Sequence, residues 1–173
     1  TPKNKMNLFL DYKKKIFNYL IILNKKKIIV VPDNFKSLTV ELPPRNQKSD
    51  ISCNAAMILA KSNKCSPVDL AEILKENLHK NFKEFKEIKI AKPGFLNISF
   101  NDSFWRNYLM QVINFDKKFG SFISAKKKYN IEFVSANPTG PLHVGHCRGA
   151  VLGDTISNLL KFNGHTITKE YYV

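Results

Sequence analysis

Apolar residues recur at two different spacings along the chain, and the change of spacing predicts where helices and strands lie. Between residues 7 and 23 they fall three or four positions apart, which is the spacing of one face of an α-helix. Around Pro93-Gly94 they alternate with polar residues instead, which is typical of a β-hairpin. Over residues 1–113 the pattern predicts helices at 7–23, 50–61, 66–78 and 103–113, and strands at 27–31, 37–42, 85–91 and 95–100.

Turn and capping residues give these elements their bounds. Ser66-Pro67 begins a helix because a serine hydroxyl caps free amides and proline suits the first helical position. Ser103 is expected to cap the last helix in the same way. The resulting order, α-β-β-α-α-β-β-α, predicts an α+β domain at residues 1–113 in which the aromatic side chains, Trp105 included, belong to the core. Residues 114–129 then read as a linker.

The remaining residues, 130–173, have the pattern of a βαβ unit. Residues 131–136 form an apolar run of strand length that ends at two prolines, and residues 165–173 resemble a second strand. Between them residues 145–162 are predicted to be a helix that ends at Asn163-Gly164. Leu152, Ile156, Leu159 and Leu160 supply its helical spacing. Gly145, Gly149 and Gly153 recur every four residues, so the helix is expected to press closely on the sheet along that face. This unit predicts the beginning of an α/β, Rossmann-type domain.

Two histidines lie in the first strand-to-helix turn of that unit. In an open parallel sheet this turn faces the ligand. His143 and His146 are three residues apart, so they share a face of the first helical turn, where unpaired amides favour an anion. Gly145 between them allows close approach of a base or sugar. The pattern therefore indicates a nucleoside triphosphate site, although neither G-x-G-x-x-G nor a P-loop motif is present. A zinc site is the alternative, but no third ligand lies at motif spacing.

Composition adds a second line of argument. The net charge of +14 favours a polyanionic partner such as RNA. However, 25 of the 28 basic residues are lysine, which an AT-rich coding bias also produces. The triplet Lys126-Lys127-Lys128 either contacts phosphate or is a solvated loop end. The cysteines, Cys53, Cys65 and Cys147, lack metal-ligand spacing and fit a reducing cytoplasm, and no apolar run is long enough to span a membrane.

The string from Glu132 through S-A-N-P-T-G-P-L-H-V-G-H to Ala150, with K-E-Y-Y-V at residues 169–173, resembles the HIGH signature region of arginyl-tRNA synthetases, which are class I enzymes. The turn A-K-P-G-F-L-N at residues 91–97 resembles the extra amino-terminal domain of the same family. Cys147 departs from the small alanine or glycine expected there, and we expect it to be tolerated. The resemblance implies that residues 1–113 contact the outer corner of the L-shaped tRNA.

The resemblance also implies roles for individual residues. His143 and His146 would bind ATP phosphates and stabilise the transition state, and Pro141 and Gly145 would belong to the same ATP site. Ser135 and Asn137 would hold the ammonium and carboxylate groups of arginine, although both residues also suit a simple turn. Glu132 would receive the guanidinium group, or else it occupies an edge position facing water. No protein-bound metal is expected.

The implied reaction forms arginyl-adenylate from ATP, with Mg²⁺ as part of the substrate complex, and L-arginine, and then transfers arginine to tRNA(Arg). We expect a cytoplasmic monomer. One βαβ unit cannot close a doubly wound sheet, so the 173 residues alone are expected to be inactive. Two alternatives remain: a small nucleotidyltransferase that shares the H-x-G-H turn, and a catalytically silent RNA-binding module.

Overall fold

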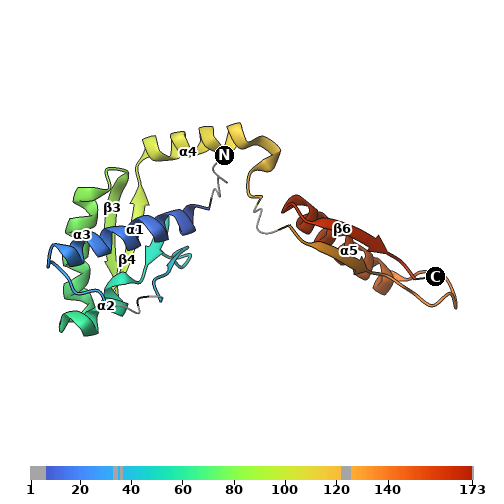
Figure 1. The fold of residues 1–173 in the computed structure, drawn as a ribbon, viewed down its shortest axis with the longest axis horizontal. Coiled ribbons are helices and arrows are strands. Elements are labelled where there is room, and N and C mark those ends of the chain that lie inside the picture. Colours follow the sequence, from blue (N-terminus) through green and yellow to red (C-terminus); the bar gives the residue numbers. More distant parts are fainter. Residues whose placement is uncertain (1–6, 33–34, 36, 122–125, 173) are drawn as a thin grey trace. The chain divides into compact units, whose positions relative to one another are not determined.

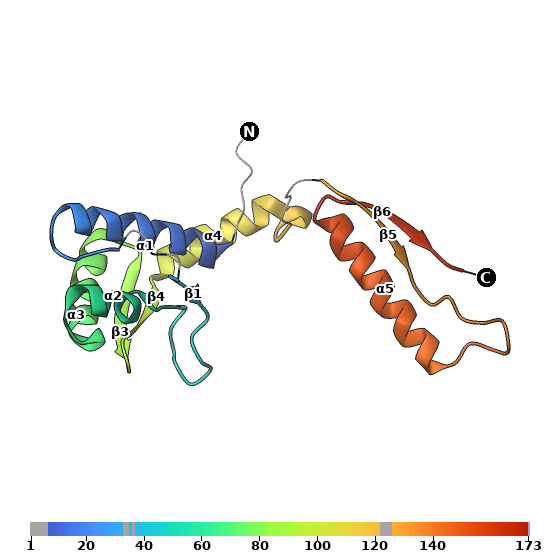
Figure 2. The same ribbon diagram turned by 60° about the horizontal axis from the view of Figure 1, so that its bottom comes forward.

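The computed structural model describes residues 7–32, 35, 37–121 and 126–172. The described chain divides into two compact units, an amino-terminal unit formed by Asn7–Asn114 and a carboxy-terminal unit that begins at Phe115. Figures 1 and 2 show that the first unit has several helices around a sheet, whereas the second consists of one long helix and two strands.

The amino-terminal unit is an α+β domain, as the sequence predicts. Its elements are α1 (Leu8–Lys25), β1 (Val40–Glu41), β2 (Ile51–Cys53), α2 (Ala55–Asn63), α3 (Pro67–Asn81), β3 (Phe85–Ala91), β4 (Phe95–Phe100) and α4 (Asp102–Phe115). The four strands form an antiparallel sheet in the order β1-β2-β4-β3. Leu96, Ile98 and Phe100 of β4 join buried residues of α1, α2 and α3 in one apolar core.

The strands of the β3–β4 hairpin lie at the predicted residues, but the earlier strands do not. Residues 27–31 are not a strand, because asparagine side chains satisfy their backbone: Val30 N–H donates to Asn63 Oδ1, and Val31 N–H donates to Asn24 Oδ1. The predicted strand 37–42 is reduced to β1. The predicted helix 50–61 was also wrong at its start, because Ile51–Cys53 pairs with both β1 and β4.

Helix capping follows the sequence at one position and departs from it at another. Ser66 Oγ accepts a hydrogen bond from Asp69 N–H, with Pro67 at the first position of α3, as predicted. At α4 the cap is Asn101, whose Oδ1 accepts from Phe104 N–H at 2.8 Å, so the assignment of Ser103 was wrong. Trp105 is 36% exposed and packs edge-on against Phe100, so it lies at the margin of the core.

The carboxy-terminal unit contains the predicted βαβ arrangement, β5 (Lys128–Glu132), α5 (Val144–Phe162) and β6 (Thr166–Glu170), preceded by a short 3-10 helix, η1 (Asp116–Lys118). Strands β5 and β6 are parallel. The first strand lies earlier than the predicted residues 131–136. It ends at Glu132 because Val134 and Ser135 adopt left-handed backbone conformations (φ 72° and 40°), which cannot continue a strand.

Helix α5 packs on the two strands through its smallest residues. Gly153 and Ser157 are buried, while Leu152 and Leu159 are 60% and 58% exposed. The prediction that the glycine face of this helix presses on the sheet is therefore confirmed at Gly153, and Ile156 is exposed like the two leucines. A helix can approach a sheet closely only where side chains are small, so the glycine side faces the strands and the bulkier apolar side faces outward.

Candidate functional site

The two histidines lie at the start of α5, where each imidazole accepts a hydrogen bond from a nearby backbone amide. His143 is the N-cap, and its Nδ1 accepts a hydrogen bond from Gly145 N–H at 3.1 Å. In return, His143 N–H donates to His146 Nδ1 at 3.1 Å. The rings are stacked, with centroids 3.8 Å apart and planes 24° apart. His143 is exposed and His146 is half-buried, so the pair lies on the surface of the described unit.

This geometry changes the expected anion site. The sequence argument relied on unpaired amides at the helix start. In the structure the amides of His143 and Gly145 bond to imidazole nitrogens, and those of His146 and Cys147 bond to the His143 carbonyl. These amides are therefore not free to bind an anion. The imidazole rings, together with the amide of Val144, supply the hydrogen-bond donors that remain at this point.

Glu132 lies beside a second carboxylate that the sequence reasoning missed. Glu132 and Glu170 are the last residues of β5 and β6 and are direct partners in the parallel register, so their side chains leave the same face of the sheet. The neighbouring residue Phe133 contacts α5, so the two glutamates lie on the opposite face. Both are exposed. Two adjacent carboxylates repel each other and favour a cation between them.

Ser135 and Asn137 lie in the connection between β5 and α5. Ser135 Oγ accepts a hydrogen bond from Tyr172 N–H at 3.2 Å, which ties this connection to the chain that follows β6. Asn137 is exposed, and its carbonyl accepts from Thr139 N–H in a tight turn. Pro141 is also exposed. Within the described part of the chain, no hydrogen bond joins either imidazole to Glu132, Ser135 or Asn137.

The glycines of α5 have different surroundings. A Cβ at Gly145 would lie 2.9 Å from Cε1 of the His143 ring, and a Cβ at Gly153 would lie 2.2 Å from Cγ of Phe133. Next to Gly149, by contrast, no atom would lie within 4 Å of such a Cβ. A side chain at Gly153 would thus clash with Phe133 and one at Gly145 would displace the His143 ring, whereas the space beside Gly149 is open.

Asp154 holds α5 to β6. Its Oδ1 accepts from Lys169 Nζ and its Oδ2 from Asn158 Nδ2. The hydrogen bond and charge of Lys169 keep the pKa of Asp154 below its usual range. The ion-pair partner of Asp154 is therefore Lys169 and not Arg148.

A second candidate site lies in the amino-terminal unit, and the sequence reasoning missed it. A pocket of about 520 Å³ opens on the sheet face opposite the core and is lined by Ser52, Phe95 and Asn97, with the loop around Gln47 beside it. Asn97 is only 2% exposed, and its Oδ1 has no hydrogen-bond partner. Its Nδ2 reaches Gln47 Oε1 at 3.5 Å. A buried carbonyl without a donor is unfavourable unless a ligand supplies one.

The only sequence signal for this pocket is a polar residue at the centre of an apolar strand. Asn97 stands between Leu96 and Ile98, and strand alternation places it on the face away from the core. The register aligns it with Ser52 of β2 and Lys89 of β3. This position is compatible with a solvated face, and only the loop that folds over it makes the site buried.

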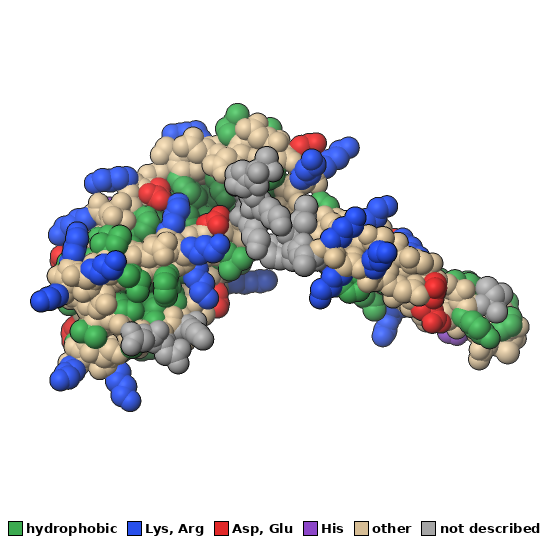
Figure 3. Space-filling model, viewed as in Figure 1, with side chains coloured by type: hydrophobic (Ala, Val, Ile, Leu, Met, Phe, Trp, Pro, Cys, Tyr) green, Lys and Arg blue, Asp and Glu red, His purple; other side chains and the backbone are tan. Residues whose placement is uncertain are grey.

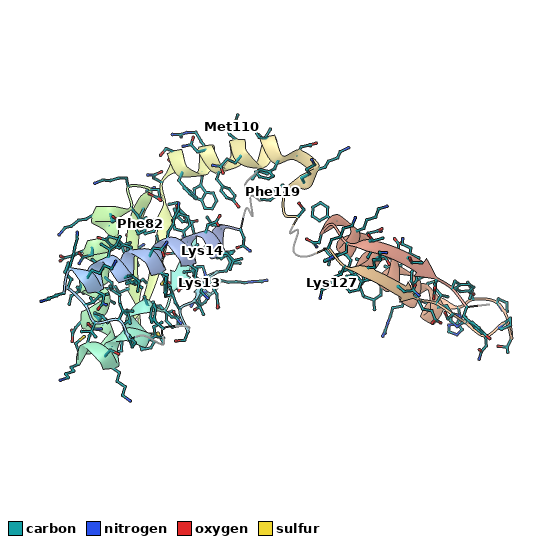
Figure 4. The ribbon with its side chains drawn as sticks, in the orientation of Figure 1. Lys13, Lys14, Phe82, Met110, Phe119 and Lys127 are labelled. Carbon is teal, nitrogen blue, oxygen red and sulfur yellow. The ribbon has the colours of Figure 1, made fainter. Side chains whose placement is uncertain are left out.

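Basic side chains are spread over the visible face of both units (Figure 3). In Figure 3 lysine and arginine side chains project over most of the visible surface, while acidic ones are few. Figure 4 shows Lys13 and Lys14 on α1 and Lys127 just before β5. Lys13 and Lys14 line a shallow hollow with Leu10 and Phe17. Arginine, which binds phosphate with two hydrogen bonds, contributes only three residues.

The described residues lack two features that would indicate other functions. They contain no group of three or more His, Cys, Asp or Glu side chains arranged to hold a metal ion. None of their helices is long and apolar enough to cross a membrane. Cys53, Cys65 and Cys147 are free thiols, and burial raises the pKa of the Cys53 thiol to about 12.

Comparison with known proteins agrees with this geometry. The family described as tRNA synthetases class I (R), catalytic domain, matches residues 108–173. The parallel βαβ unit with its histidine turn is thus the beginning of a class I aminoacyl-tRNA synthetase catalytic domain. The family described as arginyl tRNA synthetase N terminal domain matches residues 14–100, half of the chain. The chain belongs to the arginyl-tRNA synthetase family.

Individual relatives give the same result. The chain is 49% identical over 169 residues to the arginine–tRNA ligase of Pelagibacter ubique and 43% identical to that of Agrobacterium fabrum, covering 97% of this chain and 29% of each relative. It therefore spans less than a third of their length. Among solved structures it is similar in fold to the arginyl-tRNA synthetases of Plasmodium falciparum (TM-score 0.65, 20% identity, 93% of this chain and 30% of that one) and Thermus thermophilus (0.57, 23%, 96% and 25%).

Proposed function

We propose that this chain is the amino-terminal portion of an arginine–tRNA ligase. In that reaction the carboxylate of L-arginine attacks the α-phosphorus of ATP, pyrophosphate leaves, and the arginyl group then passes to the terminal adenosine of tRNA(Arg). The observation that carries the proposal is the stacked His143–His146 pair at the carboxyl edge of a parallel strand, inside a region that matches the class I catalytic family. The protein would act as a cytoplasmic monomer.

ATP would be bound at the histidine pair. Each ring uses Nδ1 internally and keeps its other nitrogen for the ligand, so two donors lie side by side for phosphate oxygens whose charge grows in the transition state. The open space beside Gly149 and the exposed Pro141 leave room for the nucleotide. Mg²⁺ would arrive bound to the phosphates of ATP, because it prefers oxygen ligands and this turn offers imidazole nitrogens.

L-Arginine would be bound at the strand ends. Its guanidinium group has five donors in one plane and suits a carboxylate. Glu132 is the expected acceptor, and Glu170 lies beside it. Ser135 and Asn137, in the connection that follows β5, would contact the ammonium and carboxylate groups. The Ser135 hydroxyl accepts from Tyr172 N–H and retains its own proton as a donor, so contact with the arginine carboxylate is chemically possible.

The tRNA would contact the amino-terminal domain, residues 1–113, joined by the linker 114–129 to the catalytic part that starts at residue 130. The high lysine content supplies electrostatic attraction to phosphate. The pocket around Asn97 and Phe95 would receive an unstacked base, because it combines a ring surface with a buried carbonyl that lacks a donor. Proteins that recognise bases in single-stranded RNA loops use these two kinds of contact, stacking on an aromatic ring and hydrogen bonding to the edge of the base.

The test uses a chimeric ligase in which residues 1–173 replace the matching segment of the Pelagibacter ubique enzyme. His143→Ala and His146→Ala should each reduce arginine-dependent pyrophosphate exchange by about 100-fold or more, as expected for lost transition-state donors. Affinity for tRNA should change little. Exchange at the level of the unmodified chimera would contradict the proposal. The 173 residues alone should show no exchange.

A further inference from the structure

We propose that His143 and His146 are each other's positioning residues: their reciprocal bonds hold both imidazoles in the neutral form that carries its proton on Nε2. The pair would thus present two Nε2–H donors, fixed in direction before any ligand arrives. This inference concerns the chemical state of the side chains, and its test needs no ligase activity.

The tautomer follows from the hydrogen-bond donors. Gly145 N–H points at His143 Nδ1, and His143 N–H points at His146 Nδ1, both at 3.1 Å. A backbone N–H can only donate, so each Nδ1 must offer a lone pair. In a neutral imidazole the proton is then on the other nitrogen, Nε2. A proton added at Nδ1 would place two donors face to face and break the bond.

The mutual dependence follows from the positions of the acceptors. The His146 ring holds the backbone amide of His143, and the His143 ring holds the amide of Gly145, the residue before His146. Stacking at 3.8 Å fixes the two ring planes against each other. Loss of either ring therefore frees an amide of the helix start as well as a ligand donor, and it removes the surface against which the other ring packs.

Close packing at Gly145 supports the same conclusion. A methyl group there would lie 2.9 Å from Cε1 and 3.1 Å from Nδ1 of His143. The His143 ring thus lies directly over this glycine, and any side chain there would displace the ring from its present position. The arrangement resembles a capping box, in which the N-cap side chain and the side chain three residues later each accept a bond from the backbone near the other.

The experiment is imidazole nitrogen-15 NMR on the full 173-residue chain, labelled at histidine. His143 and His146 should each show a single neutral tautomer with an unprotonated Nδ1, although the solvent exposure of His143 would otherwise permit exchange between tautomers. His79 is an internal control, because it is exposed and its ring has no hydrogen-bond partner in the part of the chain that the structure describes. Tautomer averaging at His143 or His146 like that at His79 would overturn the proposal.

Two variants test the coupling. His146→Asn retains an acceptor at the position of Nδ1, whereas His146→Leu retains only bulk. Hydrogen exchange of the His143 amide should quicken by roughly fivefold to tenfold in His146→Leu, the equivalent of one lost hydrogen bond, and should change less than about twofold in His146→Asn. Equal exchange in both variants would contradict the coupling. If amide exchange is faster throughout α5 in both variants, the tautomers of His143 and His146 measured in the unmodified chain still test the proposal.

Discussion

Gly153 of α5 lies against the side chain of Phe133, so closely that an added methyl group would be 2.2 Å from its Cγ and 2.4 Å from its Cβ. This contact joins the helix to the residue that immediately follows β5. It sets the distance between the helix that carries the histidine pair and the strand that carries Glu132. The relationship therefore connects packing in the carboxy-terminal unit with the geometry of the candidate site.

Gly153→Ala should destabilise this unit by about 1–3 kcal/mol, because overpacking outweighs the gain in helix propensity. The matched control is Gly149→Ala, one turn away, where no neighbour would be touched. That variant should leave stability unchanged or raise it by up to about 1 kcal/mol. Hydrogen exchange of the α5 amides measures both. Equal protection in the two variants would show that the Phe133 contact does not limit the helix position.

Asp154 gives a pH-dependent prediction. Lys169 lowers its pKa in the folded chain, so the stabilisation is fully present above the unfolded value of about 3.9 and is lost as the pH falls through the lower folded value. Asp154→Asn removes this dependence. The difference in unfolding free energy between the two proteins should therefore be constant near neutral pH and shrink below pH ~4. A difference that persists unchanged in more acidic solution would exclude the ion pair as its cause.

Asn97→Leu should weaken tRNA binding without lowering the stability of the amino-terminal unit. The leucine removes a buried carbonyl that has no partner, so the amino-terminal unit should be as stable as before or more stable. Affinity for tRNA(Arg) should fall about tenfold, the equivalent of one lost hydrogen bond to a base. Fluorescence of Trp105, the only tryptophan, reports unfolding of this unit. Asn18→Leu, at an exposed position on α1, is the control and should leave affinity unchanged.

Glu132→Gln in the chimeric ligase should raise KM for arginine by about 10- to 100-fold, because a charge-assisted hydrogen bond becomes a neutral one. Glu170→Gln tests the neighbouring carboxylate. If the guanidinium spans both side chains, KM for arginine should rise about tenfold in this variant also. KM for ATP should stay constant in both. Unchanged arginine kinetics in Glu170→Gln would restrict the contact to Glu132.

Several features could be predicted from local sequence because they depend on neighbouring residues alone. Ser66-Pro67 begins α3 by capping, Gly164 ends α5 with a left-handed backbone (φ 82°), and alternation places the β3–β4 hairpin. The histidine turn was recognised from spacing for the same reason. The βαβ order followed from the apolar run at 131–136, the prolines that end it and the helical spacing from residue 145 onward.

Other features depend on partners far away in the chain. Residues 28–31 could not be distinguished from a strand, because the side chain that satisfies Val30 belongs to Asn63. Likewise, Glu132 carries a sequence signal only as an acid in a strand, and its neighbour Glu170 follows from parallel register. The pocket at Asn97 needs the loop around Gln47 to cover it.

By itself the sequence determined the two-part organisation of elements, the family, and the identity of the chemical groups, since each rests on residue type and short-range spacing. Tertiary structure alone decided how those groups are paired. Two backbone amides at the start of α5, those of His143 and Gly145, bond to the imidazoles rather than being left for an anion, and the parallel register places Glu170 beside Glu132. The physical reason is that hydrogen bonds and close contacts between distant residues are satisfied only once the chain has folded.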